Sequence, residues 1–282
     1  MEQTSEQQVE AARLGDMAAL EELIHAVQDR IYNLAMRMLG HPQDAQDATQ
    51  EILVKMITHL ADFRGDSTFA TWVYRIALNT LLNLRKQQAE RQTESFEHLA
   101  ERIEVGLTWS TGIKETNVNE HLLAEEVRMS CTQGMLLCLD RDQRIAYILG
   151  EVFEVSSQQG GEILEITPQA FRQRLSRARQ ALRQFMQSTC GLVNVANPCR
   201  CQKQIAPGIA SGRLRADRLL FVQHPVAPHA HHQPDPTAQM QELRTLDRVA
   251  AIYRSHPTYA APAIFIESIK RLITSDHFTL FT

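Results

Sequence analysis

Apolar residues recur every three or four positions through the first part of the chain, which is the spacing of one helix face. One stripe covers residues 20–38, a second covers 52–60, and a third covers 72–84. Glycine and proline interrupt the pattern at residues 40–42, and Gly65 interrupts it again, ahead of the capping candidates Asp66, Ser67 and Thr68. The pattern therefore predicts three amphipathic helices in this part of the chain.

The rest of the chain alternates between irregular and helical patterns. Residues 91–128 carry eight acidic and four basic side chains without a clear apolar period, which is typical of a flexible acidic linker. Helical spacing returns at 129–186. Six of the ten prolines then fall between residues 187 and 240, before apolar spacing reappears between 238 and 276. No segment has a convincing strand pattern, so the chain is predicted to be all-α.

These changes of pattern divide the chain into four parts. A first helical domain covers residues 9–90, a flexible acidic linker covers 91–128, and a second helical domain covers 129–186. An extension at 187–282 contains cysteine and histidine in its irregular first part and is partly helical toward its end. A chain of 282 residues is long enough for two or three small domains of this kind.

Composition sets only broad limits on function. The net charge is −4, so the charge of the whole chain does not indicate a nucleic-acid partner. No run approaches the roughly 18 apolar residues of a membrane span, and the polar N-terminus lacks the pattern of a signal peptide. Five cysteines, an odd number, do not indicate the disulfide framework of a secreted protein. We expect a cytoplasmic protein with no membrane association.

Residues 156–185, SSQQGGEILEITPQAFRQRLSRARQALRQF, have the pattern of a helix-turn-helix. A short helix meets a turn at residues 165–166, after which Thr167 is a good N-cap and Pro168 suits the first helical position. The core stripe of the second helix consists of Phe171, Leu175, Ala178 and Leu182. A pair of glycines at 160–161 lies inside the first helix, where glycine costs about 1 kcal/mol relative to alanine.

The face opposite that core stripe suits DNA. At about 100° per residue, glutamine and serine side chains fall opposite the core, and arginines line both flanks. Amides and hydroxyls can read base edges while arginines reach phosphates or guanines. Between Glu165 and Asp217 the chain has nine basic and no acidic residues, whereas ordinary exposed helices mix signs. A solvated basic face is the alternative, and the one-sided charge favours DNA contact.

The stretch ADFRGDSTFATWVYRIALNTLLNLRK, residues 61–86, brings aromatic and basic side chains together. The aromatic residues are Phe63, Phe69, Trp72 and Tyr74, and the basic residues are Arg64, Arg75, Arg85 and Lys86. Trp72 belongs to the apolar stripe of its helix. Tyr74, Arg75 and Asn79 lie off that stripe, so they are the better candidates for a function at the surface.

Together the two helical parts resemble the extracytoplasmic-function (ECF) sigma factors, the two-domain promoter-recognition subunits of bacterial RNA polymerase. HPQDAQDATQEILVKMITHLADFRGDSTFATWVYRIALNTLLNLRK resembles the family's region 2, with its D-A-x-D-x-x-Q-E helix, F-R-G-D-S turn and T-W-x-Y-R-I-A-x-N helix. LDRDQRIAYILGEVFEVSSQQGGEILEITPQAFRQRLSRARQALR resembles region 4. The resemblance covers about half of the chain, roughly residues 10–90 and 130–186, with two motif blocks in the expected order.

The resemblance implies partners and a role for the first domain. RNA polymerase core and promoter DNA would be the partners, with an anti-sigma protein as a further candidate. Region 2 of the family opens the promoter at the minus-ten element, and opened bases need aromatic faces and basic groups to hold them. The residues that would capture the melted strand are Arg64, Trp72, Tyr74, Arg75 and Asn79. Arg64, Arg85 and Lys86 are candidates for phosphate contacts. Core packing is the competing interpretation for Trp72 and Phe69.

The resemblance implies two further sets of site residues. Asp47, Gln50 and Glu51 match the family's polymerase-binding helix, for which a generic acidic surface is the alternative. Region 4 would read the minus-thirty-five element through Thr167, Gln169, Arg172, Gln173, Ser176 and Arg177. The polymerase makes the bonds, so no catalytic residue is expected, and no phosphate loop or nucleophile motif indicates an enzyme. The alternative function is an autonomous helix-turn-helix regulator, which would not need the region 2 motifs.

The extension places Cys190, Cys199 and Cys201 close together, and His224, His229, His231 and His232 follow. Three thiolates and one imidazole could hold zinc tetrahedrally, but C-x8-C-x-C is not a standard zinc motif. A reversible thiol switch and burial as small hydrophobes are the alternatives, so no metal ligand or cofactor is assigned. Cys131 and Cys138 lie on an apolar helix face and are expected in the core. The extension's length and its apolar helical stripe predict that it regulates the sigma domains in cis.

Overall fold

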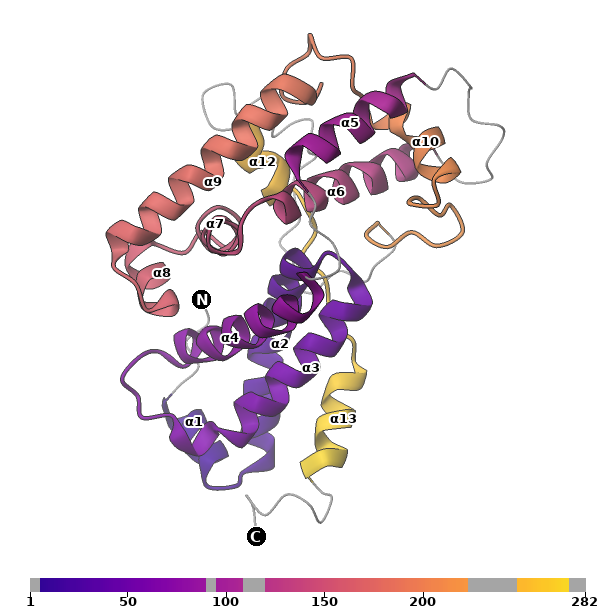
Figure 1. The fold of residues 1–282 in the computed structure, drawn as a ribbon. Coiled ribbons are helices and arrows are strands. Elements are labelled where there is room, and N and C mark those ends of the chain that lie inside the picture. Colours follow the sequence, from indigo (N-terminus) through magenta and orange to yellow (C-terminus); the bar gives the residue numbers. More distant parts are fainter. Residues whose placement is uncertain (1–5, 90–94, 109–119, 223–247, 274–282) are drawn as a thin grey trace.

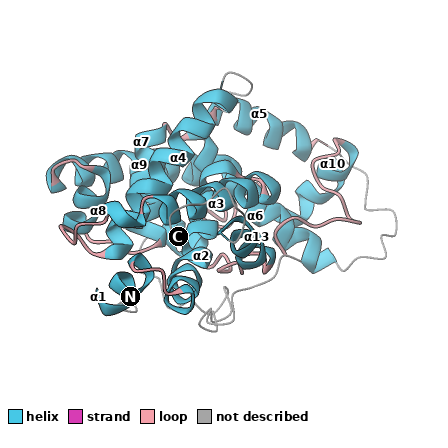
Figure 2. Cartoon of the chain, turned by 90° about the horizontal axis from the view of Figure 1, so that it is seen from below, coloured by secondary structure: helices cyan, strands magenta, loops and turns pink. Residues whose placement is uncertain are grey.

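The computed structural model describes residues 6–89, 95–108, 120–222 and 248–273. Within these ranges every regular element is a helix, as the prediction of an all-α fold required, and Figure 2 accordingly shows only helix and loop colours. The helices form two packed groups, and the C-terminal segment (yellow) crosses from one group to the other (Figure 1).

The first group contains the three helices predicted from the apolar stripes and one short helix before them. Its elements are α1 (Glu6–Arg13), α2 (Met17–Leu39), α3 (Pro42–Thr58), the 3-10 turn η1 (Leu60–Asp62) and α4 (Phe69–Ala89). Gly40 ends α2 in the left-handed region at φ 79°, which favours glycine, and Thr68 Oγ1 caps α4 by accepting from Thr71 N at 3.2 Å. The predicted breaks between helices are therefore confirmed.

The second group begins inside the span that was predicted to be a flexible linker. Its elements are α5 (Phe96–Leu107), α6 (Glu120–Cys138), α7 (Arg141–Tyr147), the π segment η2 (Ile148–Val152), α8 (Ser157–Leu164) and α9 (Pro168–Thr189). The expectation of an irregular linker is wrong for residues 96–107, because α5 buries Leu99 and Ile103 one turn apart against the core. The acidic residues of α5 lie on its exposed face. The high acidic content of the segment therefore made its short helical period of apolar residues hard to recognise in the sequence.

The helix-turn-helix has the predicted local chemistry. Thr167 Oγ1 accepts from Ala170 N at 3.1 Å, Pro168 follows at the first helical position, and Glu165 turns the chain at φ 54°. The structure also accounts for the glycine pair. A Cβ at Gly160 would overlap the ring of Phe171, and a Cβ at Gly161 would lie 2.8 Å from the carbonyl oxygen of Ile166. Both glycines let the two helices approach each other closely.

The extension packs against both groups. Its described elements are η3 (Cys201–Gln204), α10 (Ile205–Ala210), α12 (Arg248–Arg254) and α13 (Ile264–Ile273). The η3 turn and α10 contact α6, and α12 contacts η2 and α9. By contrast, α13 lies beside α2 in the other group (Figure 1), where the ring centroids of Phe265 and Tyr32 are 6.4 Å apart. Ser255 to Ala263 connect α12 to α13 across the junction. The two groups thus share one continuous hydrophobic core that includes Tyr253, Tyr259 and Phe265.

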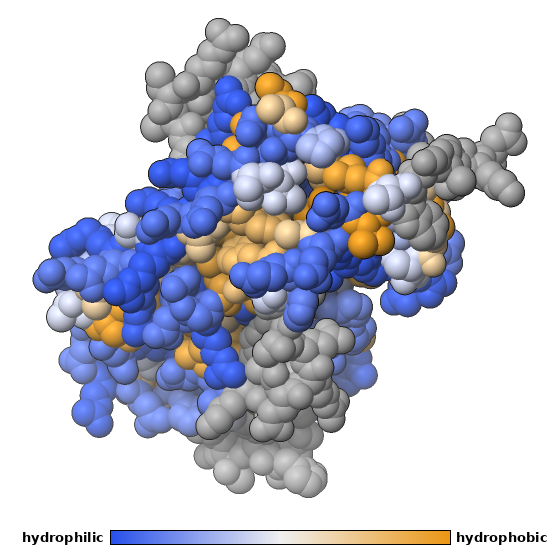
Figure 3. Space-filling view, turned by 45° about the horizontal axis from the view of Figure 1, so that its top comes forward, coloured by the Kyte–Doolittle hydropathy of each residue, from blue (hydrophilic) through white to orange (hydrophobic). Residues whose placement is uncertain are grey.

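The predicted apolar stripe of the C-terminal tail is buried where the structure describes it. Val249, Ala250 and Tyr253 are buried on α12, and Phe265 and Ile269 are buried on α13, whereas Ile264 is half exposed. Leu243 and Leu246 lie outside the described residues, and nothing is described of the side chain of Leu272. Figure 3, in which the top of the molecule in Figure 1 is turned forward, shows mostly polar side chains with apolar ones gathered near the centre of that face.

Candidate nucleic-acid interface

The second helix of the helix-turn-helix presents the predicted polar face to solvent. Its core stripe is buried as expected, and Phe171, Ala178 and Leu182 are fully covered. Every side chain predicted to contact the upstream element is exposed, namely Thr167, Gln169, Arg172, Gln173, Ser176 and Arg177. The structure thus brings amides, a hydroxyl and guanidinium groups onto one accessible face, as groove reading requires.

The arginines of α9 are not equivalent. Arg174 pairs with Asp142 at 2.8 Å, Arg179 pairs with the buried carboxylate of Glu151, and Arg172 donates to Ser157 Oγ at 3.2 Å. Arg177 has no hydrogen-bonding or ionic partner among the described residues. Because a group that is already paired must give up its partner to bind DNA, Arg177 is the arginine best placed for a new contact.

Glu151 links the helix-turn-helix to the extension. It lies in the π segment η2, is only 3% exposed, and accepts from Arg179 of α9 on one oxygen and from Arg254 of α12 at 3.1 Å on the other. Arg254 also donates to the Glu151 backbone carbonyl at 2.8 Å. A buried carboxylate needs such partners to offset the cost of its burial. Removing the tail would remove Arg254 and leave Glu151 with Arg179 as its remaining arginine partner.

The aromatic residues of the turn in the first group form a small cluster of edge-on and tilted rings. The Phe63, Phe69 and Trp72 ring centroids lie 5.4–5.8 Å apart, and Phe69 is buried. Trp72 is half buried and packs on the core. Part of its side chain therefore serves core packing, which was the competing interpretation, and the rest is accessible to solvent. Arg64 and Asn79 are exposed. The side chains of Arg85 and Lys86 lie outside the described residues.

Tyr74 is buried, contrary to the sequence-based expectation, and Arg75 is half buried and bonded to the second helix group. Tyr74 is 9% exposed and its ring lies 6.4 Å from that of Phe153, and burial raises the pKa of its hydroxyl. Arg75 donates from Nε and Nη2 to the carbonyl oxygen of Glu162, at 3.0 and 2.9 Å. The cause is the packing of α4 against α8, which covers the face of α4 that its own apolar stripe leaves polar.

The predicted polymerase-binding residues share one polar face of α3. Asp47 is exposed, and Gln50 and Glu51 are half buried. Asp47 accepts from Gln43 Nε2 at 3.2 Å, and Glu51 accepts from Lys55 Nζ at 2.6 Å. These contacts join residues of the same helix, so the face itself stays open to a partner.

Sequence reasoning missed the residues that join the tail to both helix groups. Asn33 of α2 is 2% exposed; its Oδ1 accepts from Tyr259 N at 2.9 Å, and its Nδ2 donates to Tyr259 O at 2.8 Å. Asp29 Oδ1 accepts from Ala261 N at 2.8 Å. An asparagine inside the apolar stripe of residues 20–38 was the available signal, because a buried amide needs partners.

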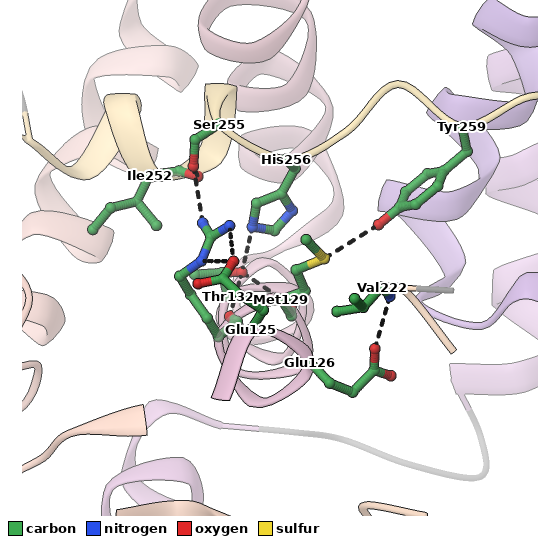
Figure 4. Close-up of polar contacts among 10 residues, drawn as sticks. Glu125, Glu126, Met129, Thr132, Val222, Ile252, Ser255, His256 and Tyr259 are labelled. Atoms are coloured by element: carbon green, nitrogen blue, oxygen red, sulfur yellow. Dashed lines mark hydrogen bonds and ion pairs between the residues drawn. The ribbon is translucent and has the colours of Figure 1, made fainter. Parts of the chain in front are cut away.

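The same tail segment bonds to α6 in the second group (Figure 4). Arg128 Nη1 donates to Ser255 Oγ at 2.9 Å, Thr132 Oγ1 lies 2.9 Å from His256 Nε2, and Tyr253 Oη donates to the Thr132 carbonyl at 3.1 Å. Burial, followed by the charges of Arg128 and Arg37, lowers the pKa of His256 well below 6.5. The tail is therefore held on both sides of the junction by buried polar contacts.

Glu126 of α6 fixes the earlier part of the extension. Its carboxylate is 3% exposed and accepts from the backbone N–H groups of Leu220, Phe221 and Val222, at 2.6 to 3.2 Å. Figure 4 shows this contact on the side of α6 away from Ser255. Nothing in the sequence distinguished Glu126 from the other acidic residues of 91–128 as an anchor for the extension. Its partners are backbone groups nearly a hundred residues away.

Four cysteines line one cavity of about 140 Å³ between α5, α6 and the extension: Cys131, Cys190, Cys199 and Cys201. All five cysteines are free thiols and half buried, so the expectation that Cys131 and Cys138 pack against the core is confirmed. No group of three or more His, Cys, Asp or Glu side chains in the described ranges is arranged to hold a metal ion. His224, His229, His231 and His232 lie outside these ranges.

A helix-turn-helix with an exposed amide and guanidinium face, packed beside a helical group with an aromatic and basic turn, defines a DNA-binding transcription factor. Family comparison makes the class specific. Residues 23–91 match Sigma-70 region 2, and residues 130–182 match Sigma-70 region 4. The chain belongs to the ECF sigma factors, which direct RNA polymerase core to promoters and initiate transcription.

Curated relatives match most of their own length. The RNA polymerase sigma-H factor of Pseudomonas aeruginosa is 31% identical over 186 residues, covering 66% of this chain and 95% of the relative. The ECF RNA polymerase sigma factor SigW of Bacillus subtilis is 30% identical over 185 residues, covering 65% and 97%. About a third of this chain therefore has no counterpart in these two alignments.

Two solved structures share a lower sequence identity with this chain. CnrH in complex with the cytosolic domain of CnrY shares 22% identity at a TM-score of 0.47, covering 66% of this chain and 98% of CnrH. RpoE with the anti-sigma factor NepR from Bartonella quintana shares 18% identity at a TM-score of 0.42, covering 59% and 96%. Across the described part of the chain, no helix is long and apolar enough to cross a membrane.

Proposed function

We propose that this sigma factor uses two separate surfaces on DNA and a third on polymerase. Region 2 within residues 9–90 binds polymerase through Asp47, Gln50 and Glu51. It captures the melted strand through Arg64, Trp72, Tyr74, Arg75 and Asn79. Region 4 within 129–186 reads the upstream element through Thr167, Gln169, Arg172, Gln173, Ser176 and Arg177. The exposed face of α9 and the open polar face of α3 support these roles.

The chain acts by binding rather than by catalysis, in the cytoplasm where its polymerase lies. Its contribution is the free energy of promoter contacts and of DNA distortion, since the polymerase makes the bonds. The relatives are sigma factors, and the described residues that face DNA are amides, hydroxyls and guanidinium groups suited to binding.

We further propose that the extension at 187–282 holds the two sigma regions in a closed arrangement. The observation that carries this proposal is the covered face of α4, where Tyr74 is buried and Arg75 is bonded to Glu162 of the helix-turn-helix. Bases cannot stack on a ring that a neighbouring helix covers. The tail at 248–269 reinforces the contact, because it bonds to Asn33 on one side and to Thr132 and Glu151 on the other.

An anti-sigma protein is a further candidate partner. The tail already occupies the junction between the two sigma regions, so such a protein would have to displace it or bind alongside it. Contacts within this one chain join the tail to both regions, through Asn33, Arg128 and the Glu151 carbonyl.

In vitro transcription tests the proposed function directly. Purified core polymerase is incubated with the promoter upstream of this protein's own gene, with and without the full chain. Transcripts from one start site that require the chain support the assignment of the surfaces. Binding to that promoter without polymerase, together with no transcript, would instead indicate an autonomous helix-turn-helix regulator.

One matched pair of variants tests the recognition face. Arg177→Ala removes an exposed arginine of α9 and is expected to weaken promoter binding by about 1–3 kcal/mol if it contacts a base. Arg215→Ala also removes an exposed arginine, but one that pairs with Asp217 in the extension. Equal transcription by the two variants would contradict the proposed recognition face.

A further inference from the structure

Cys190 and Cys199 lie opposite each other where the extension leaves the sigma domain. Cys190 is the residue that ends α9, and it faces Cys199 across an isolated parallel β-bridge. Gly191 permits this approach, because a Cβ there would overlap the carbonyl oxygen of Cys199 and the guanidinium of Arg200. The two backbones therefore touch at this point.

The loop between these two cysteines is held closed by its own polar groups. The side-chain amides of Asn194 and Asn197 both donate to the carbonyl oxygen of Gln187, at 3.1 and 2.9 Å. Arg200 donates to the carbonyl oxygens of Asn197 and Val195, at 2.6 and 2.9 Å. The proximity of Cys190 and Cys199 is thus part of a built structure and costs no further ordering of the chain.

The spacing of a β-bridge suits a disulfide. Paired strands lie roughly 4.8 Å apart, and disulfides join Cα atoms separated by about 4.4–6.8 Å. Directly paired residues also project their side chains to the same side of the bridge. Cys201 and Cys131 line the same cavity, but neither is paired with another cysteine through a backbone bridge in the described residues.

We propose that Cys190 and Cys199 are a modification site at which hydrogen peroxide, or another two-electron oxidant of that class, forms an intramolecular disulfide. One thiolate attacks a peroxide oxygen, the O–O bond breaks, and the departing hydroxide is protonated to water, which leaves a sulfenic acid. The second thiol displaces that hydroxyl as water and forms the S–S bond. In sum, two thiols and one peroxide give one disulfide and two waters.

The surroundings make the reaction selective and dependent on pH. Burial and the neighbouring Cys190 raise the pKa of Cys199, which Arg200 partly offsets. Burial, and then the other thiols, raises the pKa of Cys201 to about 12, and burial also raises the pKa of Cys131. Because the thiolate is the reactive form, Cys131 and Cys201 should stay reduced, and attack by the Cys199 thiolate should become faster as the pH rises above neutrality.

The site is also connected to the tail. Arg248, the first residue of α12, donates to the carbonyl oxygen of Val193 in the loop between the two cysteines, at 3.3 Å. A disulfide would fix this loop against the end of α9. The chemical proposal does not depend on the transcription function, so its test uses only the purified protein.

The test is thiol mapping of the full chain. Reduced protein, freed of reductant, is treated with hydrogen peroxide at pH 7 and at pH 8.5, alkylated, and digested for mass spectrometry. Three of the five thiols should stay reduced and so be alkylated. The peptides containing Cys190 and Cys199 should be joined by a disulfide that dithiothreitol reduces. Joining should be several-fold faster at the higher pH.

Matched variants identify the pair. Cys190→Ser and Cys199→Ser should each abolish the joined peptide, whereas Cys201→Ser, two residues away, should leave it unchanged. Five alkylated thiols after peroxide treatment would overturn the proposal, as would a bond between Cys131 and Cys201. Zinc that copurifies at one per chain and protects these thiols would overturn it too. Circular dichroism of each variant confirms that loss of the bond is not loss of fold.

Discussion

The substitution Asn33→Ala should open the closed arrangement while leaving both sigma regions folded. Asn33 holds the tail through both backbone groups of Tyr259, at 2.9 and 2.8 Å, in a place where both residues are 2% exposed. Alanine keeps the helix, because it is the best helix former. It removes both partners of Tyr259 without adding bulk, so the perturbation falls on the junction between α2 and the tail.

The magnitude follows from the two backbone groups that lose their partners. A buried donor or acceptor left unsatisfied costs about 1–3 kcal/mol, so the pair should weaken the docked tail by about 2–4 kcal/mol after water relieves part of the cost. At 1.4 kcal/mol per factor of ten, this raises the open population about 30- to 1,000-fold.

Hydrogen exchange followed by mass spectrometry measures this opening directly. The amide of Tyr259 is itself a donor to Asn33, so peptides covering residues 253–262 should exchange faster by the same factor. His25→Ala is the matched control, because His25 lies exposed on the same helix, two turns earlier. Unchanged exchange in the tail of a folded Asn33→Ala protein, relative to that control, would refute the idea that Asn33 holds the tail.

Four other substitutions, one of them a control, test the packing on which the site rests. Glu126→Gln should lower the stability of the folded chain by about 2 kcal/mol in urea unfolding, since charged hydrogen bonds to three backbone amides are lost; no change would mean that the extension is anchored elsewhere. His256 is kept neutral in the folded state and charges below pH 6.5 in the unfolded one, so stability should fall as the pH drops below that value, by up to about 1.4 kcal/mol per pH unit. His256→Gln should lose this dependence, and a slope that persists would assign it to another group. Gly160→Ala should cost about 1–3 kcal/mol because its Cβ meets Phe171, whereas Gly134→Ala, with open space around its Cβ, should stabilise by about 1 kcal/mol; equal effects would contradict the close approach of α8 and α9.

Local chemistry in the sequence was enough to predict the helix-turn-helix. The cap at Thr167, the turn at Glu165 and the buried stripe of Phe171 and Leu182 all depend on residues within a few turns of one another. The face of α9 opposite its buried stripe is exposed in the structure, as the helical period of an amphipathic helix predicts. Short-range rules therefore predicted which face of α9 is exposed, and the role of that face in reading DNA stays a prediction.

The burial of Tyr74 and the hydrogen bonds from Arg75 to Glu162 could not be predicted in that way. Both lie off the apolar stripe of α4, and the stripe describes only how α4 packs within its own group. A second helix group covers the remaining face, and the residues that bring it there, such as Asn33 and Glu126, bond to backbone groups 226 and 94–96 positions away. Backbone partners leave no pattern of residue types, so side-chain periodicity cannot reveal them.

The covered face of α4 has a consequence for how the protein must work. If Tyr74 and Arg75 hold the melted strand, α4 and α8 have to separate first, so the closed structure is one of at least two states. Polymerase and promoter can shift that equilibrium only by as much as they bind the open state more tightly. Converting a population that is 99% closed into one that is 99% open requires a difference of about 5.5 kcal/mol. The loss of Asn33 would by itself supply roughly half of that amount. A variant with the tail released should therefore need far less core polymerase to reach half-maximal transcription, whereas its maximal rate, which depends on the open complex alone, should not change.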